Sequence, residues 1–147
     1  NVSLIPSYGA EMRGGTTTCS VTISDEPIGS PMLPEANYVM VLNRPSLDKY
    51  EPAVEPGGRL YINESLVDRR AGRTDIDAHY IPCNAIAAEL GNPRVANMIM
   101  LGMFLKHSGA ASVDSVLESL LQVLGESKRH LLDVNRKALE KGVELAG

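Results

Sequence analysis

The chain has 147 residues, a length that fits one domain with a single hydrophobic core. Hydrophobic residues make up 44% and charged residues 22% of the sequence, which excludes disordered, collagen-like and coiled-coil proteins. The formal net charge of −4 lacks the basic excess that a nucleic-acid backbone requires, and the longest apolar run, 98–105, is far too short to span a bilayer. We therefore expect neither nucleic acid nor a membrane as a partner.

Two strands joined by a glycine-rich connection are predicted at the N-terminal end. Val2–Ile5 is a short β-prone run that Pro6 ends, and Thr16–Ser24 has the Thr, Val and Ile content typical of a strand. The connection between them is shorter than the usual crossover between parallel strands, so the second strand is predicted to run antiparallel within the sheet.

Three further apolar runs, 38–42, 59–62 and 78–81, predict strands that are buried on both faces. Helix-start chemistry at Pro45–Tyr50 and a polar stretch before residue 78 supply the connections between them. This order predicts a single three-layer α/β domain with a mixed, mostly parallel sheet flanked by helices and a helical C-terminal third.

The last third of the sequence predicts four helices, at 84–90, 92–107, 113–124 and 127–145. Asn92 before Pro93, and Ser112 before the third helix, are residues that begin helices, while Gly91 and Gly125 are placed to end them. The helix 92–107 is apolar on nearly all sides. We interpret it as core, with a subunit interface as the alternative.

Polar residues follow each predicted strand: Ser7, Tyr8, Asn43, Asn63, Ser65, Cys83 and Asn84. Open α/β sheets bind ligands beyond the carboxyl ends of their parallel strands, so these residues are predicted to gather along one rim. Asn84 as a helix N-cap and Asn43 as a turn residue are the alternative, structural interpretations.

The connection from Tyr8 to Gly15 is the densest candidate for a binding site. Gly14 and Gly15 allow close approach of the backbone to a ligand, Arg13 offers a forked guanidinium to a phosphate or carboxylate, and Glu11 is placed to orient Arg13. The alternative is that the glycines only permit a tight connection. The pattern matches neither a dinucleotide fingerprint nor a Walker A loop.

No catalytic group can be assigned from the remaining residues. The arginines of segment 69–73 could meet an acidic partner or form a solvated loop, and the three histidines are widely spaced. Cys19 and Cys83 lack the spacing of cluster or zinc ligands and predict free thiols in a reducing cytoplasm. We therefore expect that the chain does not catalyse a reaction alone.

Several segments resemble the gamma subunit of 2-oxoacid:ferredoxin oxidoreductases, closest to the 2-oxoglutarate branch. They are Pro6–Thr16, Cys19–Val21, Ile28–Pro31, Ile81–Asn84, Glu89–Arg94 and Ala96–Met98, with Ala10 where the family often has Pro. The resemblance implies a subunit of a cytoplasmic enzyme of anaerobic metabolism that oxidatively decarboxylates a 2-oxoacid, giving acyl-CoA, CO2 and reduced ferredoxin.

The resemblance also implies a division of labour. Thiamine diphosphate and iron–sulfur clusters are expected in partner subunits, alpha and beta with a possible delta, and not on this chain alone. This chain would cover the active-site region and help place coenzyme A, through Tyr8, Glu11, Arg13, Gly14 and Gly15, with no catalytic and no metal-binding residue of its own. The alternatives are a stand-alone α/β binding module for a nucleotide-like anion and a purely structural scaffold that docks through the helix 92–107.

Family members usually open with a strand and a G-x-G-G-Q-G loop ahead of the segment that begins here. We therefore expect residues 1–147 to form a single domain of the pyruvate/ketoisovalerate oxidoreductase gamma type that lacks its N-terminal strand and glycine-rich loop.

Overall fold

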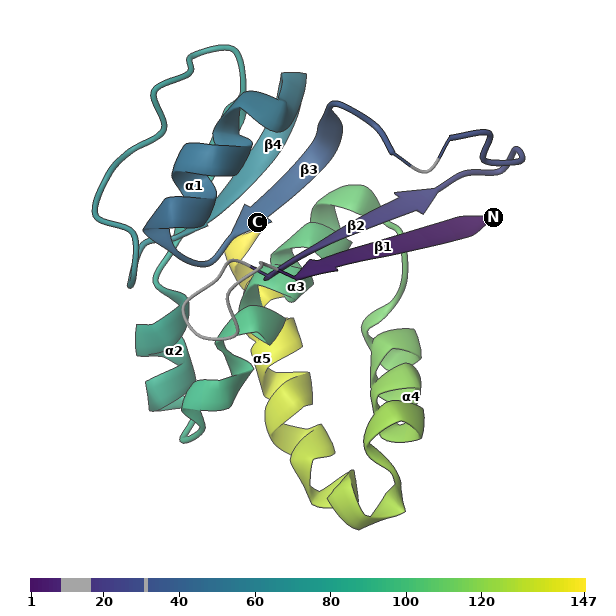
Figure 1. The fold of residues 1–147 in the computed structure, drawn as a ribbon. Coiled ribbons are helices and arrows are strands. Elements are labelled where there is room, and N and C mark those ends of the chain that lie inside the picture. The colour runs from purple at the N-terminus through teal and green to yellow at the C-terminus, as the bar shows by residue number, and fades with distance from the viewer. Residues whose placement is uncertain (9–16, 31) are drawn as a thin grey trace.

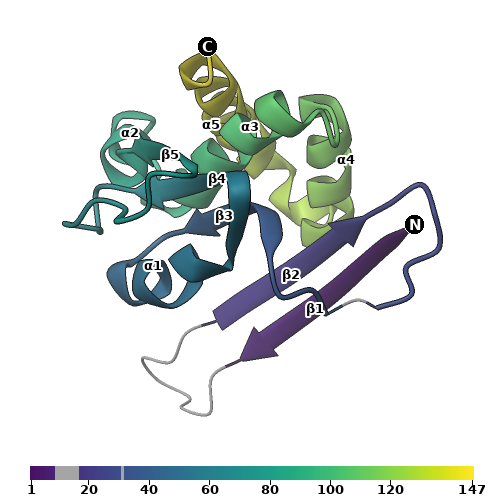
Figure 2. The same ribbon diagram turned by 90° about the horizontal axis from the view of Figure 1, so that it is seen from above.

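The computed structural model describes residues 1–8, 17–30 and 32–147 (Figures 1 and 2). Its strands are β1 (Val2–Tyr8), β2 (Thr17–Ile23), β3 (Ala36–Val41), β4 (Val54–Asn63) and β5 (Asp77–Ile81). Its α-helices are α1 (Arg44–Tyr50), α2 (Cys83–Glu89), α3 (Ala96–Ser108), α4 (Val113–Leu124) and α5 (Leu132–Leu145), with short 3-10 helices at Glu51–Ala53, Pro93–Val95 and Glu126–Leu131.

The five strands form two separate sheets. β3, β4 and β5 make a parallel sheet with β4 in the centre, while β1 and β2 pair with each other as an antiparallel ribbon. The prediction of an α/β fold with a mostly parallel sheet and a helical C-terminal third is confirmed. The antiparallel strand does not lie within that sheet, because all seven residues of β2 pair with β1.

The parallel sheet is covered on both faces, which gives the predicted three layers. Leu60 and Ile62 of β4 pack with Leu47 of α1 on one face, whereas Tyr61 packs with Met100 of α3 on the other. Figure 2 shows α1 on one side of the sheet and α3 with α5 on the opposite side. Alternate residues of β4 therefore enter two different cores, as expected of a central parallel strand.

Helices α3 and α5 cross at two glycines. A Cβ on Gly102 would collide with the Leu139 backbone, and a Cβ on Gly142 would collide with the carbonyl of Ile99. Because the two backbones touch here, α3 lies between the sheet, α4 and α5. The interpretation of this apolar helix as core is confirmed.

Local sequence sets most helix boundaries. Asn43 and Ser112 accept hydrogen bonds from the backbone N–H groups of Ser46 and Ser115, and Asn92 accepts one from Arg94. Three predictions differ from the structure. The helix predicted from residue 92 begins at Ala96, because Pro93–Val95 forms a 3-10 helix. Asn84 lies inside the first turn of α2 and is not its N-cap, and the last α-helix begins at Leu132, because the six residues before it form a 3-10 helix.

None of the helices in the described part of the chain combines the length and apolar content needed to cross a membrane.

Candidate functional site

The predicted binding connection leaves β1 at Tyr8 and enters β2 at Thr17, and these two residues are the last pair of the ribbon. The backbone of Tyr8 is therefore placed, while Glu11, Arg13, Gly14 and Gly15 lie outside the described residues. The antiparallel pairing brings the two ends of this connection side by side. The assignment of these five residues to a binding site stays a prediction.

The carboxyl ends of β4 and β5 meet at a network of hydrogen bonds centred on Asn63. The Asn63 amide nitrogen donates to Asn84 Oδ1 at 2.8 Å, and Asn63 Oδ1 accepts from the N–H groups of Ser65 and Cys83 at 3.3 and 3.2 Å. Ser65 Oγ accepts from Asn84 N at 3.2 Å. Side chains at the end of β4 and just after it thus accept hydrogen bonds from the N-terminal N–H groups of α2. The N-cap residue of this helix, Pro82, has no side-chain acceptor that could do so.

The predicted rim therefore exists in part. Asn63, Ser65, Cys83 and Asn84 do come together, but they satisfy one another, and Asn63 is only 1% exposed. Asn43 caps α1. Ser7 and Tyr8 are not on this rim, because β1 belongs to the separate ribbon.

Two of the arginines in the segment 69–73 hold this loop to the region that follows α1. Glu51, which is buried, accepts from Arg69 Nη2 at 3.1 Å and from the backbone N–H groups of Gly72 and Arg73. Burial alone would raise the pKa of Glu51, but these hydrogen bonds outweigh it and lower the pKa below its usual value. The alternative in which these arginines form a solvated loop is wrong for Arg69 and Arg73. Both are engaged within the chain and are not free to meet an acidic partner.

The two cysteines differ in environment and do not fit an iron–sulfur site. Cys19 is exposed on β2, while Cys83 is fully buried, and burial raises the pKa of its thiol to about 11. A cluster ligand must be a thiolate, and this environment favours the neutral thiol. Among the residues that the structure describes, no group of three or more His, Cys, Asp or Glu side chains could hold a metal ion.

A polar cluster that the sequence did not indicate lies between β4, β5 and the end of α3. The Tyr61 hydroxyl is 2.8 Å from His107 Nδ1, and His79 Nε2 is 2.9 Å from Asp77 Oδ2, which also lies 3.4 Å from Arg59 Nε. The register pairs Arg59 with Asp77 and Tyr61 with His79. Side chains two residues apart in a strand lie on the same face, so the sequence could have grouped Arg59 with Tyr61 and Asp77 with His79. His107 belongs to this cluster only because α3 packs against the sheet, which the sequence does not show.

Both members of the Tyr61–His107 pair are neutral at pH 7. Burial raises the pKa of Tyr61 to about 12, and burial together with the nearby Arg59 and His79 lowers the pKa of His107. A neutral tyrosine bonded to a neutral imidazole joins α3 to the sheet. It is not a nucleophile–base pair directed at a substrate.

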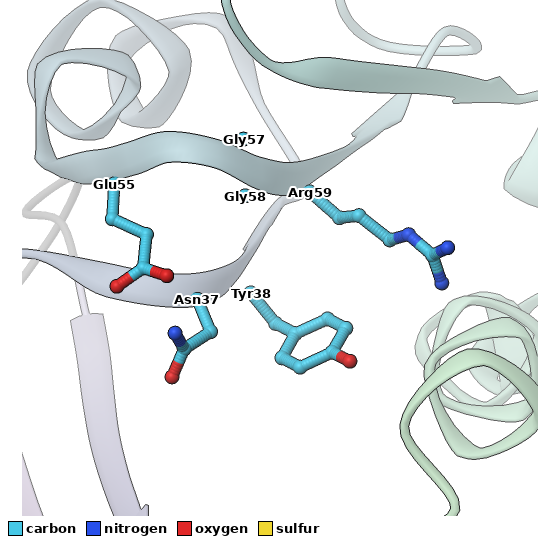
Figure 3. A pocket seen from close by; sticks show the side chains of 6 residues that line it. All are labelled: Asn37, Tyr38, Glu55, Gly57, Gly58 and Arg59. Atoms are coloured by element: carbon cyan, nitrogen blue, oxygen red, sulfur yellow. The ribbon is translucent and has the colours of Figure 1, made fainter.

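A hollow of about 320 Å³ opens beside this cluster, at the amino ends of β3 and β4 (Figure 3). A register irregularity of β4 against Ala36 and Tyr38 creates it. Gly57 adopts φ +81°, and a Cβ on Gly58 would lie 2.9 Å from the Asn37 carbonyl oxygen, so this backbone course requires glycine. The lining residues are Asn37, Tyr38, Glu55, Gly57, Gly58 and Arg59. This set offers hydrogen bonds of both polarities but no nucleophile with an adjacent base.

Residues 1–145 match the sequence profile of the family described as pyruvate ferredoxin/flavodoxin oxidoreductase. Ketoisovalerate oxidoreductase subunit VorA of Methanothermobacter thermautotrophicus is 32% identical over 99% of this chain. The 2-oxoglutarate synthase subunit KorC of Methanocaldococcus jannaschii is 33% identical over 95% of it. The chain covers 74% of KorC but only 30% of VorA, so it spans less than a third of that relative's length.

Two solved structures have the same fold. The gamma subunit of keto/oxoacid ferredoxin oxidoreductase from Geobacter sulfurreducens aligns with a TM-score of 0.78 at 26% identity, over 99% of this chain and 79% of that one. A chain of 2-oxoglutarate:ferredoxin oxidoreductase from Magnetococcus marinus, solved with 2-oxoglutarate, coenzyme A and succinyl-CoA bound, aligns with a TM-score of 0.84. That alignment covers 99% of this chain and 25% of the other at 21% identity, which establishes the shared fold.

Proposed function

Because the chain belongs to the pyruvate ferredoxin/flavodoxin oxidoreductase family, we propose that it is the gamma-type subunit of a 2-oxoacid:ferredoxin oxidoreductase. The observation that carries this proposal is the match of the family profile to residues 1–145, together with 33% identity to KorC over most of both chains.

In the proposed complex a 2-oxoacid loses CO2, its acyl group passes to coenzyme A, and the two electrons reduce ferredoxin. Thiamine diphosphate and iron–sulfur clusters, carried by partner alpha and beta subunits with a possible delta, supply the carbon–carbon cleavage and the electron transfer. The described residues of this chain do not suit a cluster, since Cys83 is a buried neutral thiol. We propose that the chain contributes structure and coenzyme A contacts.

The coenzyme A contact is proposed for the connection between β1 and β2. Tyr8 and Thr17 hold its two ends together, and the sequence between them contains Arg13 followed by Gly14 and Gly15. A guanidinium fork and exposed backbone N–H groups are suited to the phosphates of coenzyme A. Glu11 is proposed to orient Arg13, and Tyr8 to contact the same ligand.

The substrate is proposed to be 2-oxoglutarate. Relatives named for 2-oxoglutarate and for ketoisovalerate are similar to this chain to nearly the same degree, at 33% and 32% identity. The choice rests on the motif resemblance to the 2-oxoglutarate branch. Comparison of kcat/KM for 2-oxoglutarate, pyruvate and 2-oxoisovalerate in the purified complex tests it, and the highest value for either of the other acids would contradict it.

The proposed function is tested by isolating the native complex from its host without oxygen, through a tag on this chain. We expect co-purification of a thiamine diphosphate protein and an iron–sulfur protein, with reduction of ferredoxin that requires both a 2-oxoacid and coenzyme A. Complex reconstituted without this chain should lose most of that activity. Recovery of the chain alone, or full activity without it, would refute the proposal.

A further inference from the structure

Three aromatic rings stack where the end of α3 meets the parallel sheet. The Tyr61 ring of β4 lies nearly parallel to the rings of His79 and His107, with centroid distances of 5.3 and 5.8 Å. The two imidazoles, from β5 and α3, are 4.9 Å apart. We call Tyr61, His79 and His107 the ring cluster. Two histidines in contact can take up protons just below neutral pH, so the charge of this junction depends on pH.

Protonation turns a balanced site into a positive one. At neutral pH the Arg59 guanidinium is offset by the Asp77 carboxylate, and their Nε and Oδ2 atoms lie 3.4 Å apart. The same Asp77 oxygen lies 2.9 Å from His79 Nε2. Protons on both imidazoles would place three positive groups around the Asp77 carboxylate. Because the two imidazoles and Arg59 are half-buried, their mutual repulsion is screened less than it would be on an open surface.

His107 is the member of the ring cluster that resists a proton. It lies in the last turn of α3, where the partial negative charge of a helix end normally favours an imidazolium. Burial and the positive charges of Arg59 and His79 nevertheless lower its pKa. Asp77 and a backbone hydrogen bond at Ala146, next to α5, oppose this shift without reversing it. The charged and titratable groups around His107 are Arg59 and Tyr61 of β4, Asp77 and His79 of β5, and Lys106 beside it on α3.

Most of α3 is held by contacts that do not titrate. Ile99, Met100 and Met103 are buried in the core on this face of the sheet. The last turn of the helix instead contacts β4 through the hydrogen bond between His107 and Tyr61. A protonated imidazole has no acceptor nitrogen, so the Tyr61 hydroxyl can no longer donate to it. Repulsion and this loss act on the last turn and leave the apolar contacts unchanged.

We propose that the ring cluster is a pH-sensitive latch: in mild acid, protonation of His107 releases the last turn of α3 from the sheet and frees the segment 109–112 that leads to α4. At neutral pH the uncharged imidazole keeps the latch closed. The element with two states is the end of α3, and the positive charge beside Arg59 and His79 shifts it toward the open state. The latch is a property of this chain and does not rest on the proposed function.

Amide hydrogen exchange of the full chain tests the latch. Exchange is measured by mass spectrometry at pH 7.5 and 5.5 and corrected for the intrinsic pH dependence of amide exchange. We expect the opening constant of peptides covering 104–112 to rise about three- to tenfold at pH 5.5, the upper limit being set by an imidazole pKa near 6.5 in the open state. These peptides should also open at least about tenfold more often than those covering 54–63, because the release is local.

Two matched variants identify the group that titrates. His107→Gln still offers the Tyr61 hydroxyl an acceptor but cannot be protonated, so the rise at 104–112 should stay below about twofold. The control is His130→Gln, which removes an exposed histidine from the 3-10 helix before α5 and should retain the full rise.

Three results would overturn the latch. They are no rise at 104–112 in the unmodified chain, a rise of equal size in His107→Gln, and equal opening of 104–112 and 54–63, which would mean that the end of α3 is released only when the whole chain unfolds. If His107→Gln does not fold, His79→Gln takes its place. It removes one positive charge next to His107 and should reduce the rise, and an undiminished rise would overturn the latch.

Discussion

Glu51 shows how one buried carboxylate holds a long loop in place. It lies just after α1, is 7% exposed, and accepts hydrogen bonds from Arg69 and from the backbone of Gly72 and Arg73. The loop between β4 and β5 is thereby tied to the same side of the sheet as α1, where its Val67 also packs in the core with Leu47. A carboxylate is needed here, because all its partners are donors.

Replacement of Glu51 by Gln should lower the free energy of unfolding by about 1–3 kcal/mol at pH 7, since an amide cannot accept from all these donors. The folded-state pKa of Glu51 lies below its usual value. Its contribution is therefore complete above the unfolded-state pKa near 4.5 and is lost as the pH falls through the folded-state pKa. Urea unfolding at pH 7 and pH 4 measures both effects. The control is Glu89→Gln at an exposed site on α2, which should change little.

His107 predicts a pH dependence in the same direction but at higher pH. Its pKa in the folded chain is lowered from 6.5 by burial and by the nearby Arg59 and His79. The unfolded chain then binds a proton more readily than the folded chain, so stability falls as the pH drops through about 6.5. His107→Gln should flatten the unfolding free energy between pH 7.5 and 5.5, and the exposed His130→Gln should not. An unchanged pH profile in His107→Gln would contradict this account.

Arg13 carries the prediction for coenzyme A. If its guanidinium binds a phosphate of coenzyme A, Arg13→Ala should raise the KM for coenzyme A about tenfold or more, with a smaller change in the KM for the 2-oxoacid. Steady-state kinetics of the assembled complex measures both constants. Arg44→Ala is the matched control, because Arg44 forms an exposed ion pair with Asp68 on the body of the domain. Equal effects of the two variants would refute the assignment.

At the scale of elements, the glycine contact between α3 and α5 organises the helical layer. Gly102 and Gly142 allow the backbones of the two helices to touch. Ile99 and Met103 of α3 then share one core with Ala138 of α5 and Tyr61 of the sheet. In the sequence, Gly102 and Gly142 are simply glycines within helices, and each would be expected to destabilise its helix by about 1 kcal/mol relative to alanine. The structure explains them, because each lies against the backbone of the other helix.

Gly102→Ala should therefore destabilise the fold, although alanine favours helix. The added Cβ would collide with the backbone at Leu139, which cannot move as a side chain can, and we expect a loss of about 2–4 kcal/mol. Thermal unfolding measures it. Gly29→Ala, where nothing lies near the added Cβ, should be close to neutral. A stabilised Gly102→Ala variant would show that α3 and α5 do not cross at this point.

The whole molecule combines a well-buried parallel sheet with a two-stranded ribbon that has little support. β4 is paired on both sides and lies in both cores, whereas β1 and β2 pair only with each other in the described part of the chain. An isolated two-stranded ribbon is marginally stable. The ribbon is therefore expected to be the least stable part of the described fold in the isolated chain.

Hydrogen exchange of the isolated chain should show this difference. Amides of β4 should exchange slowest, while those of β1 and β2 should exchange at least about tenfold faster. Mass spectrometry of peptides from 1–8 and 54–63 separates the two regions. Ribbon amides that exchange as slowly as those of β4 would contradict this account.

The sequence alone determined the features that depend on neighbouring residues. Asn92 and Ser112 were identifiable as helix caps because capping is a contact over two or three positions. Asn43, which was interpreted as a turn residue, caps α1. The α/β class followed from the apolar runs, and the family resemblance from contiguous motifs. The residues of the predicted coenzyme A site also come from such a motif, and only Tyr8 among them lies in the described structure.

Tertiary structure decided what depends on residues that are distant in the chain. It placed the antiparallel strands in their own ribbon, satisfied Asn63 and Asn84 with each other, and brought His107 of α3 to Tyr61 of β4. It also turned the apolar side of the ribbon outward, although the alternation of β2 is the same whichever face is buried. Alternation shows that the two faces of the ribbon differ in polarity, but only the packing of the rest of the chain determines which face is the more buried.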